Sequence, residues 1–133
     1  MVVIPPEIKE LFASVKTFPL ATASSGGIPN VAPMGAVHLQ DNKVWIMNNF
    51  MNKTAANLRE NPQAAIYVHN PETKKCVQIK GTVTIHASGP EYDALKAVLD
   101  AKLPGLPAKE LMIMEVTEIF ECMPGPKAGQ KIL

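Results

Sequence analysis

The stretch VQIKGTVTI, residues 77–85, has the most regular strand pattern in this sequence. Apolar residues occupy alternate positions, as in a strand with one face in a core and the other toward solvent. These inward positions are Val77, Ile79, Val83 and Ile85. Gly81 falls on the same face, where a residue without a side chain permits the sharp bend that a closed barrel requires. We therefore expect a long, bent strand in a β-barrel.

Five further segments are typical of strands that complete an antiparallel sheet. They cover residues 18–23, 28–39, 44–47, 64–68 and 111–122. The residues SSGG at 24–27 are small enough to turn the first of these strands into the second. Helical patterns begin near residues 6, 53 and 90. With no repeat or domain boundary in view, we expect a mainly β single domain over residues 1–133 with two or three short flanking helices.

The expected strand at residues 28–39 is interrupted by two prolines. Because Pro29 and Pro33 cannot donate to a ladder, this strand is expected at a sheet edge or bulged, leaving carbonyls and neighbouring amides free for a ligand. Ala32, Gly35 and Ala36 would let a flat molecule lie close to the backbone. A flavin ring needs this combination of an apolar bed and fixed polar groups. An ordinary irregular edge strand accounts for the same residues.

The last expected strand begins with LMIM, residues 111–114, which is apolar on both sides. One side is expected to face the core, and the other then needs a second apolar cover. A partner subunit is the economical candidate for that cover.

The charge balance excludes several classes of function. The 133 residues carry 13 basic and 12 acidic side chains, for a formal net charge of +1. No broad field therefore steers the chain to nucleic acid or to an acidic membrane. Arg59 is the only arginine in the sequence, which excludes a multi-arginine clamp on a substrate.

The sequence carries no signal for a metal site, a disulfide or export. Cys76 and Cys122 stand far apart with no CxxC pair, and His38, His69 and His86 are scattered. No serine or cysteine is paired with a base, so no catalytic residue is assigned. The start MVVIPPEIKE lacks a basic region before an apolar run, and no run of about 18 apolar residues occurs. We expect a cytoplasmic protein that does not span a membrane.

The window MNNFMNKTAANL, residues 47–58, places amides, small polar groups and one lysine at the start of a helix that follows a strand. Free N–H groups and the positive end of the helix dipole converge there on any anion. Lys53 adds a positive charge and Thr54 a hydroxyl donor, which suits a terminal phosphate. In the alternative interpretation Asn52 or Thr54 simply caps the helix while Lys53 is solvated.

Three segments in this order resemble the flavin-binding split barrel of the pyridoxamine 5'-phosphate oxidase-like superfamily, and in size its small FMN-binding proteins. They are LATASSGGIPNVAPMG (20–35), VWIMNNFMNKTAANLRENPQAAIYV (44–68) and VQIKGTVTI (77–85). The resemblance covers roughly residues 18–120 and depends on order and spacing rather than on one motif. It implies an antiparallel six-stranded split β-barrel of Greek-key topology, with FMN bound at the interface of a homodimer.

The resemblance also implies which residues bind FMN. Lys53 and Thr54 would take the phosphate, the strand end at residues 47–49 would support the ribityl chain, and residues 32–35 would border the ring. Cys76, Gln78 or the C-terminal tail would reach the flavin from the neighbouring subunit. The full set is Ala32, Pro33, Met34, Gly35, Met47, Asn48, Asn49, Asn52, Lys53, Thr54, Cys76 and Gln78.

Two departures from the oxidases of this superfamily bear on activity. Ala32 stands where the oxidases place an arginine, and the tail PGPKAGQKIL (124–133) replaces their arginine- and histidine-bearing C-terminal segment. Oxidation of pyridoxamine phosphate is therefore not expected.

Two functions then remain, one of them enzymatic. In the first, the protein is an FMN oxidoreductase that passes hydride or electrons from a reduced donor to a small acceptor. In the second, it is a non-enzymatic FMN carrier or electron-transfer module for a protein partner. A barrel that has lost its flavin is a third alternative.

Overall fold

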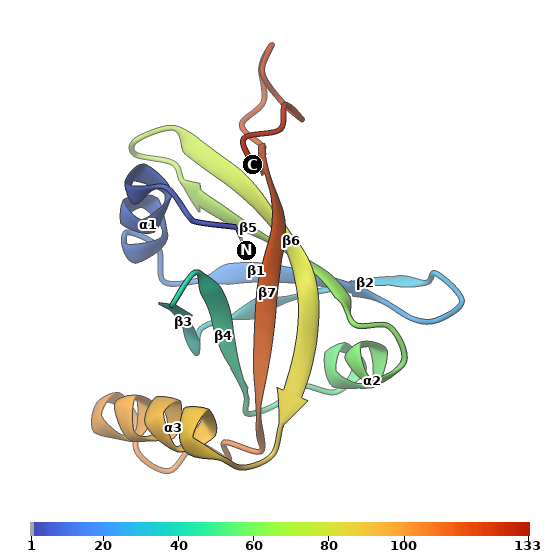
Figure 1. Cartoon of the computed structure of the whole chain (residues 1–133), viewed down its shortest axis with the longest axis vertical. Coiled ribbons are helices and arrows are strands. Elements are labelled where there is room, and N and C mark those ends of the chain that lie inside the picture. The colour runs from blue at the N-terminus through green and yellow to red at the C-terminus, as the bar shows by residue number, and fades with distance from the viewer. Residues whose placement is uncertain (1) are drawn as a thin grey trace.

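The computed structural model describes residues 2–133, which form one seven-stranded antiparallel sheet with three flanking helices (Figure 1). The strands are β1 (Phe18–Ala23), β2 (Pro29–Met34), β3 (Val37–Gln40), β4 (Lys43–Asn48), β5 (Gln63–Asn70), β6 (Lys75–His86) and β7 (Glu110–Glu121). The helices are α1 (Pro6–Ala13), α2 (Lys53–Glu60) and α3 (Pro90–Lys102). The predicted fold class, a mainly β antiparallel split barrel with short helices, is confirmed.

The sheet curls because its two edge strands are neighbours in the chain. The strand order is β2-β1-β5-β6-β7-β4-β3, so β2 and β3 lie at opposite ends of the hydrogen-bonded series. Only Gly35 and Ala36 separate these strands in sequence. Three Cα–Cα steps span at most about 11 Å, so the end of β2 and the start of β3 must lie close together although no ladder joins the two strands.

The prediction of a single strand at residues 28–39 is wrong. This segment forms two strands, β2 and β3, which are separated by Gly35 and Ala36. This break raises the strand count from the expected six to seven. The alternation of apolar residues continues through the break, so the sequence pattern alone did not reveal that the chain changes from one sheet edge to the other.

Gly81 lies where the backbones of β6 and β7 approach each other closely. The register shifts there, with Lys80 opposite Glu118 and Gly81 opposite Val116, so Thr117 forms a bulge in β7. The Thr117 hydroxyl donates to the Lys80 carbonyl at 3.2 Å. A Cβ at position 81 would lie 2.2 Å from the Glu115 carbonyl oxygen. The bend predicted at Gly81 is thus made by a bulge that only glycine accommodates.

Two apolar clusters cover the two faces of the long strands. The cluster inside the curl is closed by α1 through Ile8, Leu11 and Phe12. The second cluster lies under α3, where Leu95 packs with residues of β4 and β7. Its members on the strands are Trp45, Met47, Leu111 and Ile113.

The segment LMIM at residues 111–114 is buried on both sides, as expected, but its second cover is not a partner subunit. Met112 and Met114 belong to the inner cluster, whereas Leu111 and Ile113 face α3 of the same chain. The expectation that this strand needs a neighbouring molecule is corrected, because α3 returns across the outer face of the sheet (Figure 1).

The C-terminal tail folds back along the end of β7. Ile132 N donates to Ile119 O at 2.7 Å, and Glu121 N donates to Gln130 O at 2.8 Å. Ile132 and Leu133 pack against the inner cluster.

Within residues 2–133, none of the three helices is long and apolar enough to cross a membrane.

Candidate functional site

A cavity of about 350 Å³ lies between β2 and the segment that joins β4 to α2. Its volume falls in the range of small-molecule sites in proteins. Apolar side chains of Ala32, Met34 and Met47 line it together with the polar side chains of Asn30 and Asn49. The site thus combines an apolar bed with a few polar groups, as the sequence predicts for these two windows.

The two prolines of β2 lie at positions where the main chain does not bond to β1. The hydrogen bond from Ser24 N to Ile28 O, at 3.0 Å, fixes the phase of the β1–β2 ladder. In that phase the alternate residues Asn30, Ala32 and Met34 bond to β1. The residues between them, Val31 and the two prolines, turn their carbonyls to the free edge of the sheet. Proline is tolerated here because no ladder donor is needed at these positions.

The first turn of α2 closes the other side of the cavity. Lys53 is exposed, and Thr54 is buried with only 3% of its surface accessible. Asn30 donates from Nδ2 to Thr54 Oγ1 at 3.2 Å, which ties β2 to α2. Because the Thr54 hydroxyl is the acceptor in this bond, its own proton is available to a ligand. Asn52 precedes the helix without a side-chain capping bond, so the capping alternative is not realised by that residue.

The side chains of two asparagines form hydrogen bonds that fix the loop between β4 and α2. Asn48 Oδ1 accepts from Met51 N at 3.0 Å, and Asn48 Nδ2 donates to Glu110 Oε1 at 3.0 Å. Asn49 Oδ1 accepts from Ala108 N at 2.9 Å. Arg59, the only arginine, forms an ion pair with the same Glu110 carboxylate. These contacts fix the loop, so the start of α2 is positioned before any ligand arrives.

Nine of the twelve predicted cofactor-binding residues line this one cavity. They are Ala32, Pro33, Met34, Gly35, Met47, Asn49, Asn52, Lys53 and Thr54. Asn48 is buried beside the cavity and faces Glu110. Cys76 and Gln78 lie on β6, away from it. The structure does not bring these last three residues to the cavity within one chain.

Ala36, which the sequence predicts to leave room for a flat ligand, also lines the cavity, whereas three further lining residues were not predicted: Asn30, Phe50 and Met51. In the sequence, Phe50 is a large aromatic residue within a polar segment, and this unusual placement could have marked it as a candidate. In the structure, its side chain is 76% exposed. The role of Asn30 follows from a contact with a residue 24 positions away, which local sequence does not show.

Cys76 lies opposite Cys122 across the β6–β7 ladder, and Cys122 N donates to Cys76 O at 3.1 Å. Burial of the Cys76 thiol, together with the neighbouring Cys122 side chain and the Glu121 charge, raises its pKa from 9.0 to about 12. Two cysteines that are far apart in sequence are therefore neighbours in space. Both are free thiols.

We expect iodoacetamide at pH 8 to label Cys76 in the folded protein at least about tenfold more slowly than in urea-unfolded protein, because the thiolate is the reactive form. The same shift in pKa makes stability depend on pH. Between about pH 9 and pH 12, the Cys76 thiol is deprotonated in the unfolded protein and protonated in the folded protein. The free energy of unfolding therefore falls as the pH rises through this range. Peptide mapping by mass spectrometry measures the labelling. Equal rates in the two states would contradict the shielding of Cys76.

Among residues 2–133, no three histidine, cysteine or acidic side chains gather in a way that could hold a metal ion. The cavity beside α2 is lined by one ionisable side chain, that of Lys53. One exposed ammonium group therefore stands beside an apolar lining in this cavity.

The sequence of this chain matches a family model and a related protein. The family model described as pyridoxamine 5'-phosphate oxidase matches residues 4–123. An uncharacterized protein of Methanocaldococcus jannaschii is 38% identical over 116 residues, which cover 85% of this chain and 77% of that protein.

Solved structures agree with the fold. HupZ of Group A Streptococcus has a TM-score of 0.82 and 27% identity, covering 96% of this chain and 100% of that chain. The heme storage protein HutZ of Vibrio cholerae has a TM-score of 0.71 and 21% identity, with coverages of 90% and 95%. An FMN-binding protein of Syntrophomonas wolfei has a TM-score of 0.65 and 23% identity, with coverages of 86% and 88%. At these last two identities the likeness shows the fold alone.

Proposed function

The chain belongs to the pyridoxamine 5'-phosphate oxidase family, and from this membership we propose that it binds FMN in the cavity between β2 and α2 and acts as a flavin oxidoreductase. One observation carries the proposal: Lys53 and Thr54, in the first turn of α2, line the same cavity as the small and apolar residues Ala32 and Met34 of β2. A phosphate-binding end and a ring-sized apolar bed are thus joined in one site.

The phosphate end of this cavity suits a dianion. N–H groups at a helix start carry partial positive charge and point out of the helix. Lys53 supplies an exposed ammonium group, and the Thr54 hydroxyl, which accepts from Asn30, would donate its own proton to the phosphate. These groups would hold the FMN phosphate with charge-assisted hydrogen bonds.

The ring end of the cavity suits a flat heterocycle. Ala32, Gly35 and Ala36 leave room against the backbone of β2 and the link to β3, and Met34 and Met47 offer apolar contact. Carbonyls at the free edge of β2 would meet the polar edge of the isoalloxazine. Flavins supply hydride and single-electron transfer when bound. With one ionisable side chain in the lining, the protein binds and orients the ring and leaves the redox chemistry to it.

We further propose that a second copy of the chain covers the open side of this cavity. Both elements that form the cavity carry exposed apolar side chains, with Val31 on β2 66% exposed and Phe50 in the loop 76% exposed. Apolar groups exposed beside a ligand site are typical of an interface. In such a dimer Cys76 and Gln78 of one subunit would be available to the flavin of the other.

The visible spectrum of the purified protein tests the proposal directly. Two broad flavin bands, with FMN identified by mass spectrometry of the released chromophore, are the expected result. If the protein is colourless, added FMN should bind with quenching of flavin fluorescence. A single intense Soret band would instead indicate heme, the ligand named for the Vibrio cholerae relative. Protein that neither contains nor takes up FMN would overturn the proposal.

Turnover separates the two redox functions. Oxidation of NADH or NADPH by the FMN-loaded protein with a soluble acceptor supports an oxidoreductase, whereas reduction only by a protein donor supports an electron-transfer module. Pyridoxamine phosphate is the negative control, because the sole arginine is already paired with Glu110 and bonded to the Ala55 carbonyl.

A further inference from the structure

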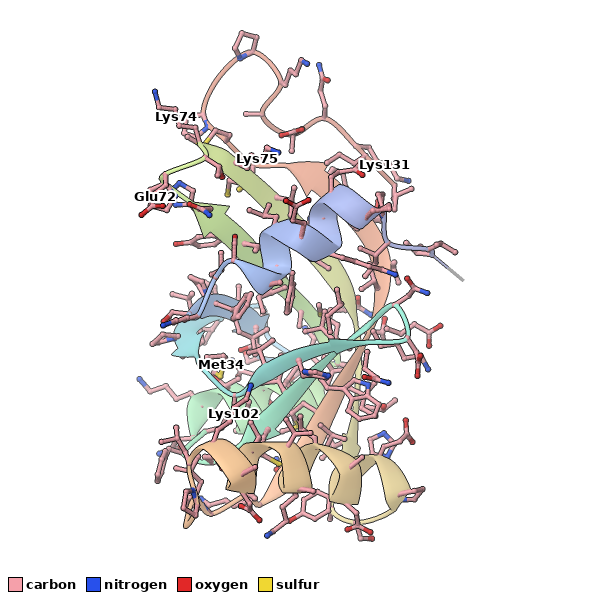
Figure 2. The ribbon with its side chains drawn as sticks, turned by 90° about the vertical axis from the view of Figure 1, so that its left-hand side faces the viewer. Met34, Glu72, Lys74, Lys75, Lys102 and Lys131 are labelled. Atoms are coloured by element: carbon pink, nitrogen blue, oxygen red, sulfur yellow. The ribbon has the colours of Figure 1, made fainter. Side chains whose placement is uncertain are left out.

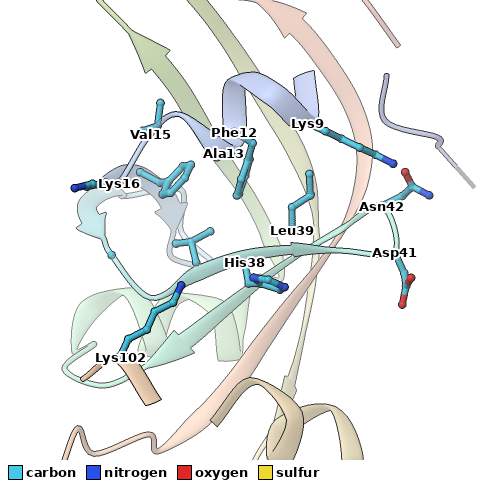
Figure 3. A pocket seen from close by; sticks show the side chains of 13 residues that line it. Lys9, Phe12, Ala13, Val15, Lys16, His38, Leu39, Asp41, Asn42 and Lys102 are labelled. Carbon is cyan, nitrogen blue, oxygen red and sulfur yellow. The ribbon is translucent and has the colours of Figure 1, made fainter. Parts of the chain in front are cut away.

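A second cavity, of about 550 Å³, lies between α1, β3 and the end of α3 (Figure 3). We call it the lysine groove, after Lys9, Lys16 and Lys102 in its walls. Lys9 comes from α1 and Lys102 from α3, and Figure 3 shows them approaching β3 from opposite sides. We call the cavity between β2 and α2, which is proposed to bind FMN, the flavin cavity. The lysine groove shares only Gly35 with it, so the two are separate sites on the two sides of the β2–β3 link.

The charge of the groove is positive. Its walls hold three lysines and one carboxylate, Asp41, which gives a net charge of +2 with His38 neutral. Within residues 2–133, the salt bridges join other side chains, and none of these three lysines has a carboxylate oxygen within 4.0 Å. The ammonium groups are therefore free to meet an anion. This local excess contrasts with the net charge of +1 for the entire chain.

The floor of the groove is apolar and partly aromatic. The rings of Phe12 and Phe18 stack with their centroids 4.5 Å apart, and both residues are buried. Val37 and Leu39 of β3 continue this surface. Val37 and Leu39 are half-buried and form the open part of this floor, so an apolar body placed on them would remove apolar surface from water. The cavity volume also lies within the range of small-molecule sites.

We propose that the lysine groove binds a small molecule with a flat apolar body and an anionic group, a carboxylate, sulfonate or phosphate. The body lies over Leu39 and its neighbours in β3, and the anionic group meets one of the two lysines, Lys9 or Lys102, which Figure 3 shows at the two ends of the groove. This inference concerns a different cavity from the flavin site and does not depend on the proposed function.

A matched pair of probes tests the groove on the full chain: 2-naphthoate, which is anionic, and 2-naphthamide, which has the same ring without the charge. Amide shifts of ¹⁵N-labelled protein locate and titrate each probe. We expect 2-naphthoate to shift the amides of residues 12, 37 and 39 and to bind up to about fivefold more tightly than 2-naphthamide, since its carboxylate forms one exposed ion pair. Lys9→Gln with Lys102→Gln should remove this preference, because it removes the lysine at each end of the groove.

The control variant is Lys74→Gln with Lys75→Gln, which removes two lysines at the opposite end of the molecule from Lys102 (Figure 2). It should keep the preference for 2-naphthoate. Equal affinities of the two probes, an equal loss in both double variants, or shifts outside the groove would overturn the inference. FMN binding is measured on the same samples, so loss of either site is seen separately from loss of the other.

Discussion

Replacing Gly81 by alanine is expected to lower the free energy of unfolding by about 3 kcal/mol, because the new Cβ has no room. It would lie 2.2 Å from the Glu115 carbonyl oxygen and 2.7 Å from Met114 Cγ. The methionine can rotate away, but the carbonyl belongs to the β7 backbone and moves only if the bulge is lost. Urea unfolding followed by Trp45 fluorescence measures the change.

Gly26→Ala is the matched control for this prediction. Gly26 lies in the β1–β2 turn, and its new Cβ would meet only Ser24 Oγ, at 3.8 Å. We expect a change of less than about 0.5 kcal/mol there, as for surface substitutions in general. Similar stability of the two variants would show that the β6–β7 contact relaxes without cost and that the bulge does not require glycine.

Replacing Lys53 and Thr54 together by alanine is expected to weaken FMN binding by about 2–4 kcal/mol, since two charge-assisted hydrogen bonds to the phosphate are lost. This corresponds to about a 30- to 1,000-fold rise in Kd. Riboflavin, which has the same ring and no phosphate, should lose much less affinity. Quenching of flavin fluorescence on titration with protein measures both ligands.

Thr54 is also part of the fold, because it is buried and accepts a hydrogen bond from Asn30. Circular dichroism must therefore show that the double variant is folded before its affinity is interpreted. Thr73→Ala with Lys75→Ala is the control, since it removes the same residue types from exposed positions in the β5–β6 turn and at the start of β6. An unchanged FMN affinity in folded Lys53→Ala, Thr54→Ala protein would remove these two residues from the site.

The parts of the fold with simple periodicity could be predicted from the sequence. The strand Phe18–Ala23 and the helix that starts at Lys53 lie where the patterns place them. The bend at Gly81 was also predictable, because a glycine on the inward face of a regular strand is typical of a bulge or a close approach of two backbones. In each case the pattern that predicts the element lies within a few neighbouring residues of the chain.

The parts that escaped prediction depend on distant residues. The break at Gly35 follows from the order of strands in the closed sheet, not from the residues around it. The cover on Leu111 and Ile113 is α3, whose position across the sheet is set by tertiary packing. The two windows of the candidate site were recognised separately, but the Asn30–Thr54 bond that joins them is a long-range contact.

The two-residue link between β2 and β3 also bears on how this chain tolerates changes in length. Extra residues inserted between Met34 and Val37 would let the edges of the sheet separate, and the flavin cavity and the lysine groove, which meet at Gly35, would both lose a wall. The turn at residues 24–27 lines neither of these two cavities and bears no such restriction. Insertions and deletions among homologues should therefore accumulate in that turn and be rare in the link.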